Sequence, residues 1–484
     1  MFAIASGRIQ SNFLSSTLVG VLLSALLLPG TAFAVPAFAR QTGQSCVSCH
    51  AGGQYPELTP YGRLFKLTGY TIGTRDVPLS VMGVVNFNRT SNISDPNGDA
   101  RADFPKDGTL KFDTGSFFIA GKVNDNIGAF VQITYNNYDG VNPNDSSFTG
   151  HSSSDQFDLR YADRFVDGSR DLIVGMSLNN NPGVQDVWNS SHGGFGYNVV
   201  PGSTGPAVAP LIAGGLAQNV AGIGAYVYCN KMVYAELSAY RTGTGVFSIM
   251  TQGFHPELGS QQILKGENPY WRVAVNRDWG PHNLMVGAFG LNAQVYDDPT
   301  DPSGATTHRF RDIGVDTQYQ YLTDLHTVVA YASFVTENHH YPDTVGNQPA
   351  AYFDALGNPT LANTNSSDTL NMLRAKVSYV YRSTYGGSLS YFNITGTTNT
   401  LNQTAGYDDT GTFVPFAGPG GNVSGNPATR GWTPERFWTP VQYLRLGMQY
   451  TAFSKFNGAS NNYDGAGRNA RDNNTLFFYA WGAF

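Results

Sequence analysis

The stretch Val233–Tyr240, VYAELSAY, alternates small or aliphatic side chains with aromatic or polar ones at every second position. Because successive side chains of a β-strand point to opposite faces, this pattern gives the strand one apolar face. The stretch Ile127–Thr134, IGAFVQIT, repeats it with Ile, Ala, Val and Ile at the odd positions. Alternation over about ten residues is what a membrane-spanning β-strand requires.

Similar stretches recur along most of the chain and predict an all-β protein, an outer-membrane antiparallel β-barrel of about 16 strands. We place the strands approximately at 79–90, 110–123, 127–138, 155–166, 169–179, 220–229, 231–242, 269–279, 282–296, 308–322, 325–338, 368–382, 385–399, 429–439, 441–456 and 473–484. The stretch 429–439 is the weakest because it holds Pro434 and is followed directly by Pro440. Without it, the two chain ends would not lie on the same side of the membrane.

The connections between these stretches alternate between short and long. Tight turns are predicted near 124–126, 167–168, 229–230, 280–282 and 323–324, and long external loops at 180–219, 243–268, 339–367 and 400–428. Charged residues make up 13% of the chain, against about 25% in soluble domains. A large soluble β protein, such as a propeller or sandwich, is the alternative. Nucleic acid is not an expected partner of a chain with net charge −6.

Residues 1–34 resemble a secretory signal peptide. Arg8 precedes an apolar core at Leu18–Leu28, and Ala32–Ala34 forms an A-x-A cleavage site. The apolar run is short for the alternative, a membrane anchor. We therefore expect export and a mature protein in the outer membrane of a Gram-negative cell.

The stretch Cys46–His50, CVSCH, matches the attachment signature of a c-type haem. The two thiols, Cys46 and Cys49, would bind one haem c covalently, and His50 would be an axial ligand of its iron. A chance match, a redox-active CxxC pair or half a zinc site are the alternatives. A zinc site needs a second pair of ligands nearby, but the next histidine is His151. With only Cys229 left over, a disulfide framework is excluded.

The segment between the signal peptide and the first strand is short. Thr59 and Pro60 predict the start of a helix that Gly69 would end, with Tyr61, Leu64 and Phe65 on one face. Such a segment is too small to enclose a haem alone. We expect it to fold inside the periplasmic half of the barrel as a plug. The predicted domains are thus the signal peptide 1–34, a monohaem cytochrome c segment 35–78 and a porin-like barrel 79–484.

Two N-terminal stretches, PAFARQTGQSCVSCH at 36–50 and PELTPYGRLFKLTGY at 56–70, precede this barrel. Together with FNG at 456–458 and YDGAGRNARDNN at 463–474, they resemble the fused monohaem cytochrome–porins of the outer membrane. Members of that family are iron oxidases of iron-oxidising bacteria. The resemblance implies an oxidoreductase that takes electrons from extracellular Fe(II). The electrons would pass through the haem across the outer membrane to a periplasmic carrier, either a cytochrome c or a copper protein.

Two other functions stay open. One is a passive porin gated by a haem-bearing plug, and the other is a cytochrome–porin with a different extracellular electron donor or acceptor. The 35–78 segment holds no Met and no second His, so a distal haem ligand from the protein would come from the barrel. Met82, His282 and His326 are the candidates.

Possible iron contacts lie in the predicted loops. Asp95, Asn97, Asp99 and Asp103 resemble half an EF-hand loop, but Ala100 and Lys106 stand where that loop needs Gly and Glu. Calcium is therefore not expected there, and a solvated loop is the simpler interpretation. The other candidate contacts are Glu337, His339, His340, Asp464 and Asp472.

Overall fold

The computed structural model describes residues 36–53, 57–101, 104, 106–141, 148–189, 205–206, 208–253, 262–296, 307–341, 365–399 and 418–484. The predicted signal peptide, 1–34, lies outside these residues. The strands are β1 (Leu79–Thr90), β2 (Leu110–Lys122), β3 (Ile127–Val141), β4 (Phe148–Asp167), β5 (Arg170–Asn179), β6 (Val220–Cys229), β7 (Val233–Thr242), β8 (Asn268–Trp279), β9 (His282–Tyr296), β10 (Thr307–Leu322), β11 (His326–His340), β12 (Ser367–Tyr381), β13 (Tyr385–Gly396), β14 (Thr429–Val441), β15 (Leu444–Lys455) and β16 (Thr475–Ala483).

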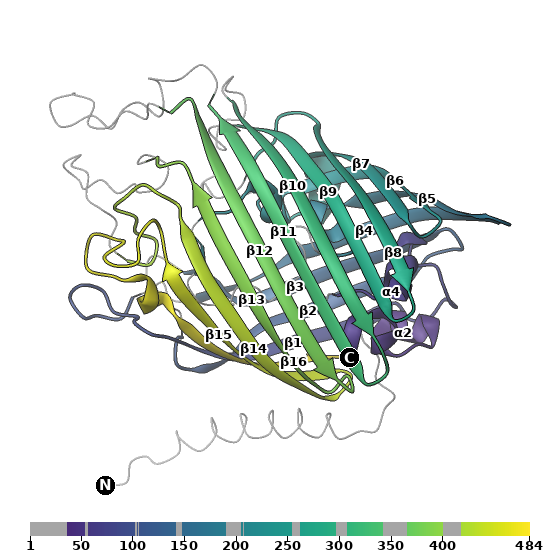
Figure 1. Cartoon of the computed structure of the whole chain (residues 1–484), viewed down its shortest axis with the longest axis horizontal. Helices are drawn as coiled ribbons and strands as arrows, with labels where there is room; N and C mark the ends of the chain where they lie inside the picture. The colour runs from purple at the N-terminus through teal and green to yellow at the C-terminus, as the bar shows by residue number, and fades with distance from the viewer. Residues whose placement is uncertain are drawn as a thin grey trace, which may run out of the picture. The chain divides into compact units, whose positions relative to one another are not determined.

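In the described part of the chain, these 16 strands form a closed antiparallel barrel, which confirms the predicted fold (Figure 1). Each strand pairs with its neighbours in sequence, and β1 closes the barrel by pairing with β16, with Met82 opposite Ala483. The proline-containing strand β14 is present, with a shift in its pairing with β15 between Trp438 and Val441. An even number of antiparallel strands is typical of bacterial outer-membrane proteins.

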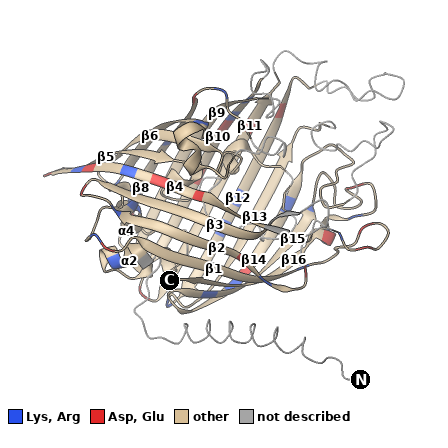
Figure 2. Cartoon of the chain, turned by 180° about the vertical axis from the view of Figure 1, so that it is seen from behind, with Lys and Arg blue, Asp and Glu red and all other residues tan. Residues whose placement is uncertain are grey.

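The two faces of each strand differ in chemistry. On β10, Gln318 and Gln320 face the lumen and are fully buried, whereas Tyr319 between them lies on the outer face. Few charged residues lie along the strands (Figure 2), and the outer face of the barrel is largely apolar. The exposed large apolar side chains on it include Val174, Met176, Ile223, Leu237, Val273, Val275, Val286, Ile313, Val315, Val377 and Leu389. This apolar outer band is what contact with lipid requires.

The N-terminal segment contributes helices α2 (Pro36–Thr42), α3 (Cys46–Cys49) and α4 (Pro60–Leu67) and the 3-10 helix η1 (Ala51–Gly53). Figure 1 shows α2 and α4 at the barrel end where the C-terminus lies, which is the end with the short turns. The segment contacts lumen-facing side chains: a Cβ on Gly52 would lie 3.0 Å from Val380 and 3.3 Å from Thr327. The predicted plug is therefore confirmed. No helix in the described ranges is long and apolar enough to cross a membrane.

In its described residues, the predicted external loop 180–219 is wrong in large part. Residues 180–189, which include α5 (Pro182–Gln185), are buried within the barrel, and so is most of the 3-10 helix η2 (Leu211–Ala213). Leu211 and Ile212 pack on lumen-facing aromatic side chains of β7, β8 and β9. We call residues 180–189 and 208–216 the lumen segment. It folds inward because the wall beside it is apolar, and burying that surface is favourable. The rest of this connection, and parts of the other long loops (254–261, 342–364 and 400–417), lie outside the described residues.

Candidate functional site: the CxxCH turn and its plug

The CxxCH motif forms one helical turn, α3, with His50 as its C-terminal cap. The His50 amide donates to the Cys46 carbonyl at 2.8 Å, so the imidazole directly follows the turn that carries both thiols. Cys46 is buried and Cys49 is half-buried. Two thiols and one imidazole on a single turn are the donor set that a c-type haem needs.

Helix α4 fixes the position of this turn. The Thr59 amide donates to the Cys49 carbonyl at 2.9 Å, and the Thr59 hydroxyl caps α4 by accepting from the Gly62 amide at 3.1 Å. Gly62 permits the contact, since a Cβ there would lie 2.2 Å from the Cys49 carbonyl oxygen. The predicted helix start is confirmed, and Gly69, with a φ of +72°, follows its C-terminal end.

Arg63 anchors α4 to the lumen wall. Its guanidinium donates to Asn283 at 2.7 Å and to Gln318 and Gln320 at 3.3 Å each. It also donates to the Leu58 carbonyl at 2.8 Å, and Leu58 pairs with His50 in a β-bridge. Burial lowers the pKa of Arg63 to about 10, so the side chain stays charged at neutral pH. This chain of contacts connects the CxxCH motif to β9 and β10.

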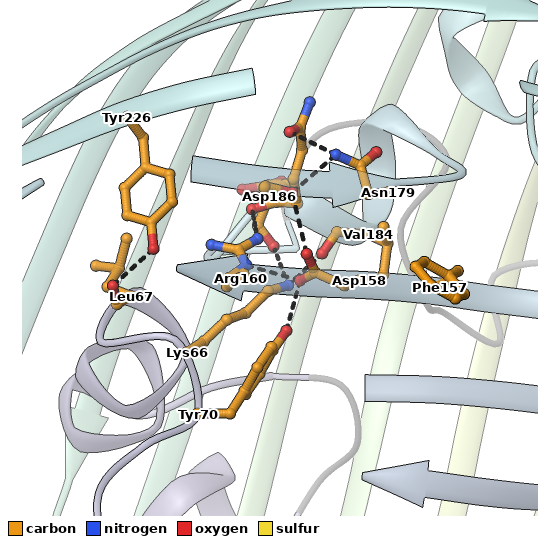
Figure 3. Close-up of polar contacts among 12 residues, drawn as sticks. Lys66, Leu67, Tyr70, Phe157, Asp158, Arg160, Asn179, Val184, Asp186 and Tyr226 are labelled. Atoms are coloured by element: carbon orange, nitrogen blue, oxygen red, sulfur yellow. Dashed lines mark hydrogen bonds and ion pairs between the residues drawn. The ribbon is translucent and has the colours of Figure 1, made fainter. Parts of the chain in front are cut away.

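Lys66 and Tyr70 anchor the other side of the plug (Figure 3). The Lys66 ammonium donates to the carbonyls of Val184 and Asp186 in the lumen segment. The Tyr70 hydroxyl donates to Asp158 on β4 at 2.6 Å, and Asp158 also pairs with Arg160 at 2.7 Å. Burial, and then the charge of Arg160, lower the pKa of Lys66 to about 8. The plug and the lumen segment are thus bonded to each other as well as to the wall.

A buried ion pair anchors the third side of the plug to the barrel wall. The Lys376 ammonium on β12 lies 3.0 Å from the Glu57 carboxylate, and both side chains are less than a tenth exposed. Burial opposes the charged form of Glu57, but the charge and hydrogen bond of Lys376 outweigh it and hold the Glu57 pKa below its usual value. None of these anchoring residues follows from a motif in the sequence. The available signal was that a segment too short to fold alone carries charged residues, which need partners on the barrel wall.

A pocket lies between the plug and the turn that joins β14 to β15. Its free volume is about 10 Å³, roughly what one water molecule needs, and it is lined by Gly53, Thr439, Gln442, Tyr443, Leu444, Arg445, Trp481 and Ala483. The Cys46 thiol donates to the carbonyl of Gln442 at 3.4 Å, so the pocket adjoins the CxxCH turn. The free volume is far below the roughly 300–1,000 Å³ of small-molecule pockets, so the hollow does not by itself accommodate a haem.

The donor set of Cys46, Cys49 and His50 fits a c-type haem. Burial, and then the neighbouring Cys46, raise the pKa of Cys49 to about 12. Redox-active CxxC pairs and zinc sites need a thiolate, which a lowered pKa favours. The raised pKa of Cys49 gives no support to a redox-active thiolate pair. In the described ranges, Cys46, Cys49 and His50 are not arranged with a further ligand to hold a zinc ion.

The three candidates for a distal ligand do not all lie on the same face of the barrel wall. Met82 lies on the lumen side of β1 and packs against a buried cluster that contains Trp481, one of the pocket residues. His282 and His326 lie on the outer face, so their prediction as lumen ligands is wrong. The His282 ring contacts Tyr319 and Trp279, and the His326 ring contacts Tyr379. The sequence alone does not show whether a residue at a strand end faces the lumen or the outside, because that depends on the register of strand pairing.

We therefore expect the variants His282→Ala and His326→Ala to leave the haem absorption spectrum unchanged in both oxidation states. The measurement is the visible spectrum of the purified holoprotein, with Met82→Leu as the informative comparison. A changed spectrum in either histidine variant would contradict the placement of these side chains on the outer face.

The candidate iron contacts do not form a site. In the described ranges, no group of three or more His, Cys, Asp or Glu residues is arranged to hold a metal ion. Glu337 faces the lumen and accepts from the Leu211 amide at 2.6 Å, while the exposed His340 lies on the opposite face, so that predicted set is not brought together. His339 instead contacts His308 at 2.9 Å.

The loop carboxylates among these candidates hold turns together. Asp95 accepts from the amides of Asn97 and Asp99, Asp464 from the amide of Arg468, and Asp472 from the amide of Asn469. These contacts favour the simpler interpretation of a structured, solvated loop at 95–99. Asp103 lies outside the described residues.

No protein-family model matches the sequence, and no curated protein is similar to it. Solved outer-membrane channels are similar in fold. Salmonella typhi OmpF in complex with daunomycin has 11% identity and a TM-score of 0.44, over 84% of this chain and 97% of that one. DcaP of Acinetobacter baumannii has 13% identity and a TM-score of 0.42, over 84% of this chain and 97% of that one. Pseudomonas putida OprB has 12% identity and a TM-score of 0.42, over 88% of this chain and 96% of that one. At these values the likeness carries no argument about function, and the fold is established by the strand pairing itself.

Proposed function

We propose that this protein is an outer-membrane c-type cytochrome that oxidises extracellular Fe(II) and passes the electron through one haem to a periplasmic carrier. The observation that carries the proposal is the position of the CxxCH turn, on a plug inside a barrel of outer-membrane type. Cys46 and Cys49 would hold the haem by thioether bonds, and His50 would ligate its iron. The haem would supply one-electron redox chemistry between the two sides of the membrane.

The surroundings of the plug support this role. The apolar band of such a barrel is about 25 Å tall, and a redox centre held inside the barrel shortens the distance that an electron has to cross. The chain would hold that centre still through Arg63, Lys66, Tyr70 and Glu57, each bonded to the wall or to the lumen segment. The short turns lie beside the haem motif, so a periplasmic cytochrome c or copper protein could approach it there.

The direct test is to add ferrous iron to the purified, oxidised holoprotein at the pH of growth and record the visible spectrum. We expect the haem bands to sharpen into those of the reduced form. A control with another one-electron reductant shows that the haem is reducible. If that reductant works and ferrous iron does not, iron is not the donor, and a cytochrome–porin with a different donor or acceptor is the correct function.

The barrel fold itself favours a second candidate, a passive porin gated by its plug. Gating would require the plug to move out of the lumen. The contacts of Glu57, Arg63, Lys66 and Tyr70 instead hold the plug in place. Solute flux into liposomes separates the two. A porin would show flux that appears when residues 35–78 are removed and that does not depend on haem reduction in the full chain.

A further inference from the structure

Two buried carboxyl groups face each other on the lumen wall. Asp312 on β10 lies directly opposite Glu337 on β11, and the two side chains are hydrogen-bonded to each other. Asp312 is 1% exposed and Glu337 is 5% exposed. An ionised carboxylate can only accept hydrogen bonds, so a bond between two carboxyl groups requires a proton on one of them.

The neighbouring strands bring apolar side chains to this pair. Leu291 on β9 lies opposite Asp312, and Leu370 on β12 lies opposite Glu337. Both leucines are buried, and among the described residues neither carboxyl group has a lysine or arginine partner. Two adjacent negative charges in such surroundings cost more than keeping one proton, as in other close carboxyl pairs.

The nearest titratable groups on the same face have partners of their own. His339 and Asp368 lie opposite each other, one lumen-facing position further from the short turns. The His339 ring contacts His308 at 2.9 Å, and Asp368 accepts from the Tyr341 hydroxyl at 2.7 Å. A histidine is uncharged from neutral to alkaline pH, so in that range it supplies no cation to the carboxyl pair.

The pair also holds the lumen segment by its backbone. Oε2 of Glu337 accepts from the Leu211 amide at 2.6 Å, and Oδ2 of Asp312 accepts from the Ile212 amide at 2.7 Å. These are the first two residues of η2, whose amides have no acceptor within the helix. Oδ1 of Asp312 is buried without a hydrogen-bond partner in the described structure, and a proton shared with Glu337 would satisfy it.

We propose that Asp312 and Glu337 share one proton and form a latch that holds η2 inside the barrel and releases it when the proton leaves. With the proton in place, the two carboxyl groups stay together and accept two successive amides. Without it, two adjacent charges repel each other in a site that excludes water, and the side chains separate. The start of η2 then loses both bonds to the wall. The latch requires no haem, so it stands or falls independently of the proposed function.

The test follows the proton and the helix separately, in the full-length protein in detergent. Infrared spectroscopy detects the carbonyl stretch of a protonated carboxyl group. Hydrogen exchange with mass spectrometry measures the protection of the peptide that contains Leu211 and Ile212, as a ratio to the intrinsic exchange rate at each pH.

The variants are Asp312→Asn and Glu337→Gln, which each replace one carboxyl group by a neutral amide that can donate to the other. Asp316→Asn is the matched control. Asp316 is buried on the same face of β10, but it pairs with Arg272 at 2.7 Å and therefore needs no proton.

At neutral pH, the wild-type protein should show a protonated-carboxyl band that both pair variants lack and that Asp316→Asn keeps. In alkaline solution this band should disappear, and the protection of the η2 peptide should fall several-fold with it. The pair variants should keep their protection, because no second charge can form beside the first.

The proposal is overturned if both pair variants keep the wild-type band at neutral pH, or if the band persists to the highest pH at which the barrel stays folded. Protection that does not change when the band disappears would overturn it as well. If one pair variant does not fold, the other gives the same comparison, and the wild-type titration still shows whether protection follows the proton.

Discussion

Replacing Cys46 and Cys49 together by serine should abolish covalent haem attachment and leave the barrel assembled. Both thioether bonds are lost, so no haem remains on the denatured chain. The strands do not depend on these thiols: the contact of Cys46 with the wall is a weak hydrogen bond to the Gln442 carbonyl at 3.4 Å, and a serine hydroxyl can donate there too. The measurement is the haem absorption of the denatured, extracted protein, alongside the mobility of the unheated protein on a gel.

The third cysteine provides the control. Cys229 ends β6 at a short turn, away from the CxxCH motif in sequence, and Cys229→Ser should retain a full complement of haem. Covalent haem in the Cys46/Cys49 double variant would refute attachment at these thiols. Loss of the folded barrel in that variant would show that the plug carries more of the assembly than its contacts indicate.

Lys376→Met should loosen the plug by about 3–5 kcal/mol, because it leaves the Glu57 carboxylate buried without its cation. The measurement is the midpoint at which denaturant releases the haem segment, followed by Soret circular dichroism. Adding Glu57→Gln to Lys376→Met should recover much of the loss, since it removes the unpaired charge. A matched control is Lys122→Met, because Lys122 pairs with an exposed Asp125 and should matter little. Equal effects of the two lysine variants would contradict the anchoring role of Lys376.

The same pair makes plug stability depend on pH. The pKa of Glu57 is held below its usual value of about 4.3, so the folded state binds fewer protons there than the unfolded state. This contribution is fully present above the unfolded pKa and is lost as the pH falls through the folded pKa. The denaturation midpoint of the wild-type plug should therefore fall in strong acid, and that of Glu57→Gln should fall less. A wild-type midpoint that does not change over this range would contradict the assignment.

Strand positions were predictable because the lipid band imposes a period of two on the sequence. The strand β7 repeats it clearly in VYAELSAY, and even the proline-containing β14 is where the alternation places it. The start of β4 could not be predicted, because its first residues, Phe148–Ser154, are mostly Gly, Ser, Thr and His and show no apolar alternation. Beyond the lipid band nothing in the sequence marks where pairing ends.

The lumen segment was missed for a different reason. A long connection with Gly, Asn and Pro has the composition of an external loop, whichever way it folds. The barrel wall held the evidence that this connection folds inward. Its lumen face carries four buried aromatic side chains on neighbouring strands, Tyr226, Tyr234, Tyr240 and Tyr270. Such an apolar lumen face predicts that something packs on it. The anchors of the plug could not be found either, since pairs such as Glu57 and Lys376 are 319 residues apart and meet only through the register of the barrel.

The central claim, that one haem in the plug carries electrons across the membrane, is tested most directly in liposomes. The full-length holoprotein is reconstituted with oxidised cytochrome c enclosed, and ferrous iron is added outside. We predict that the enclosed cytochrome c becomes reduced with the wild-type protein and stays oxidised with the Cys46→Ser/Cys49→Ser variant. No reduction with the wild-type protein, or equal reduction with both, would contradict the account.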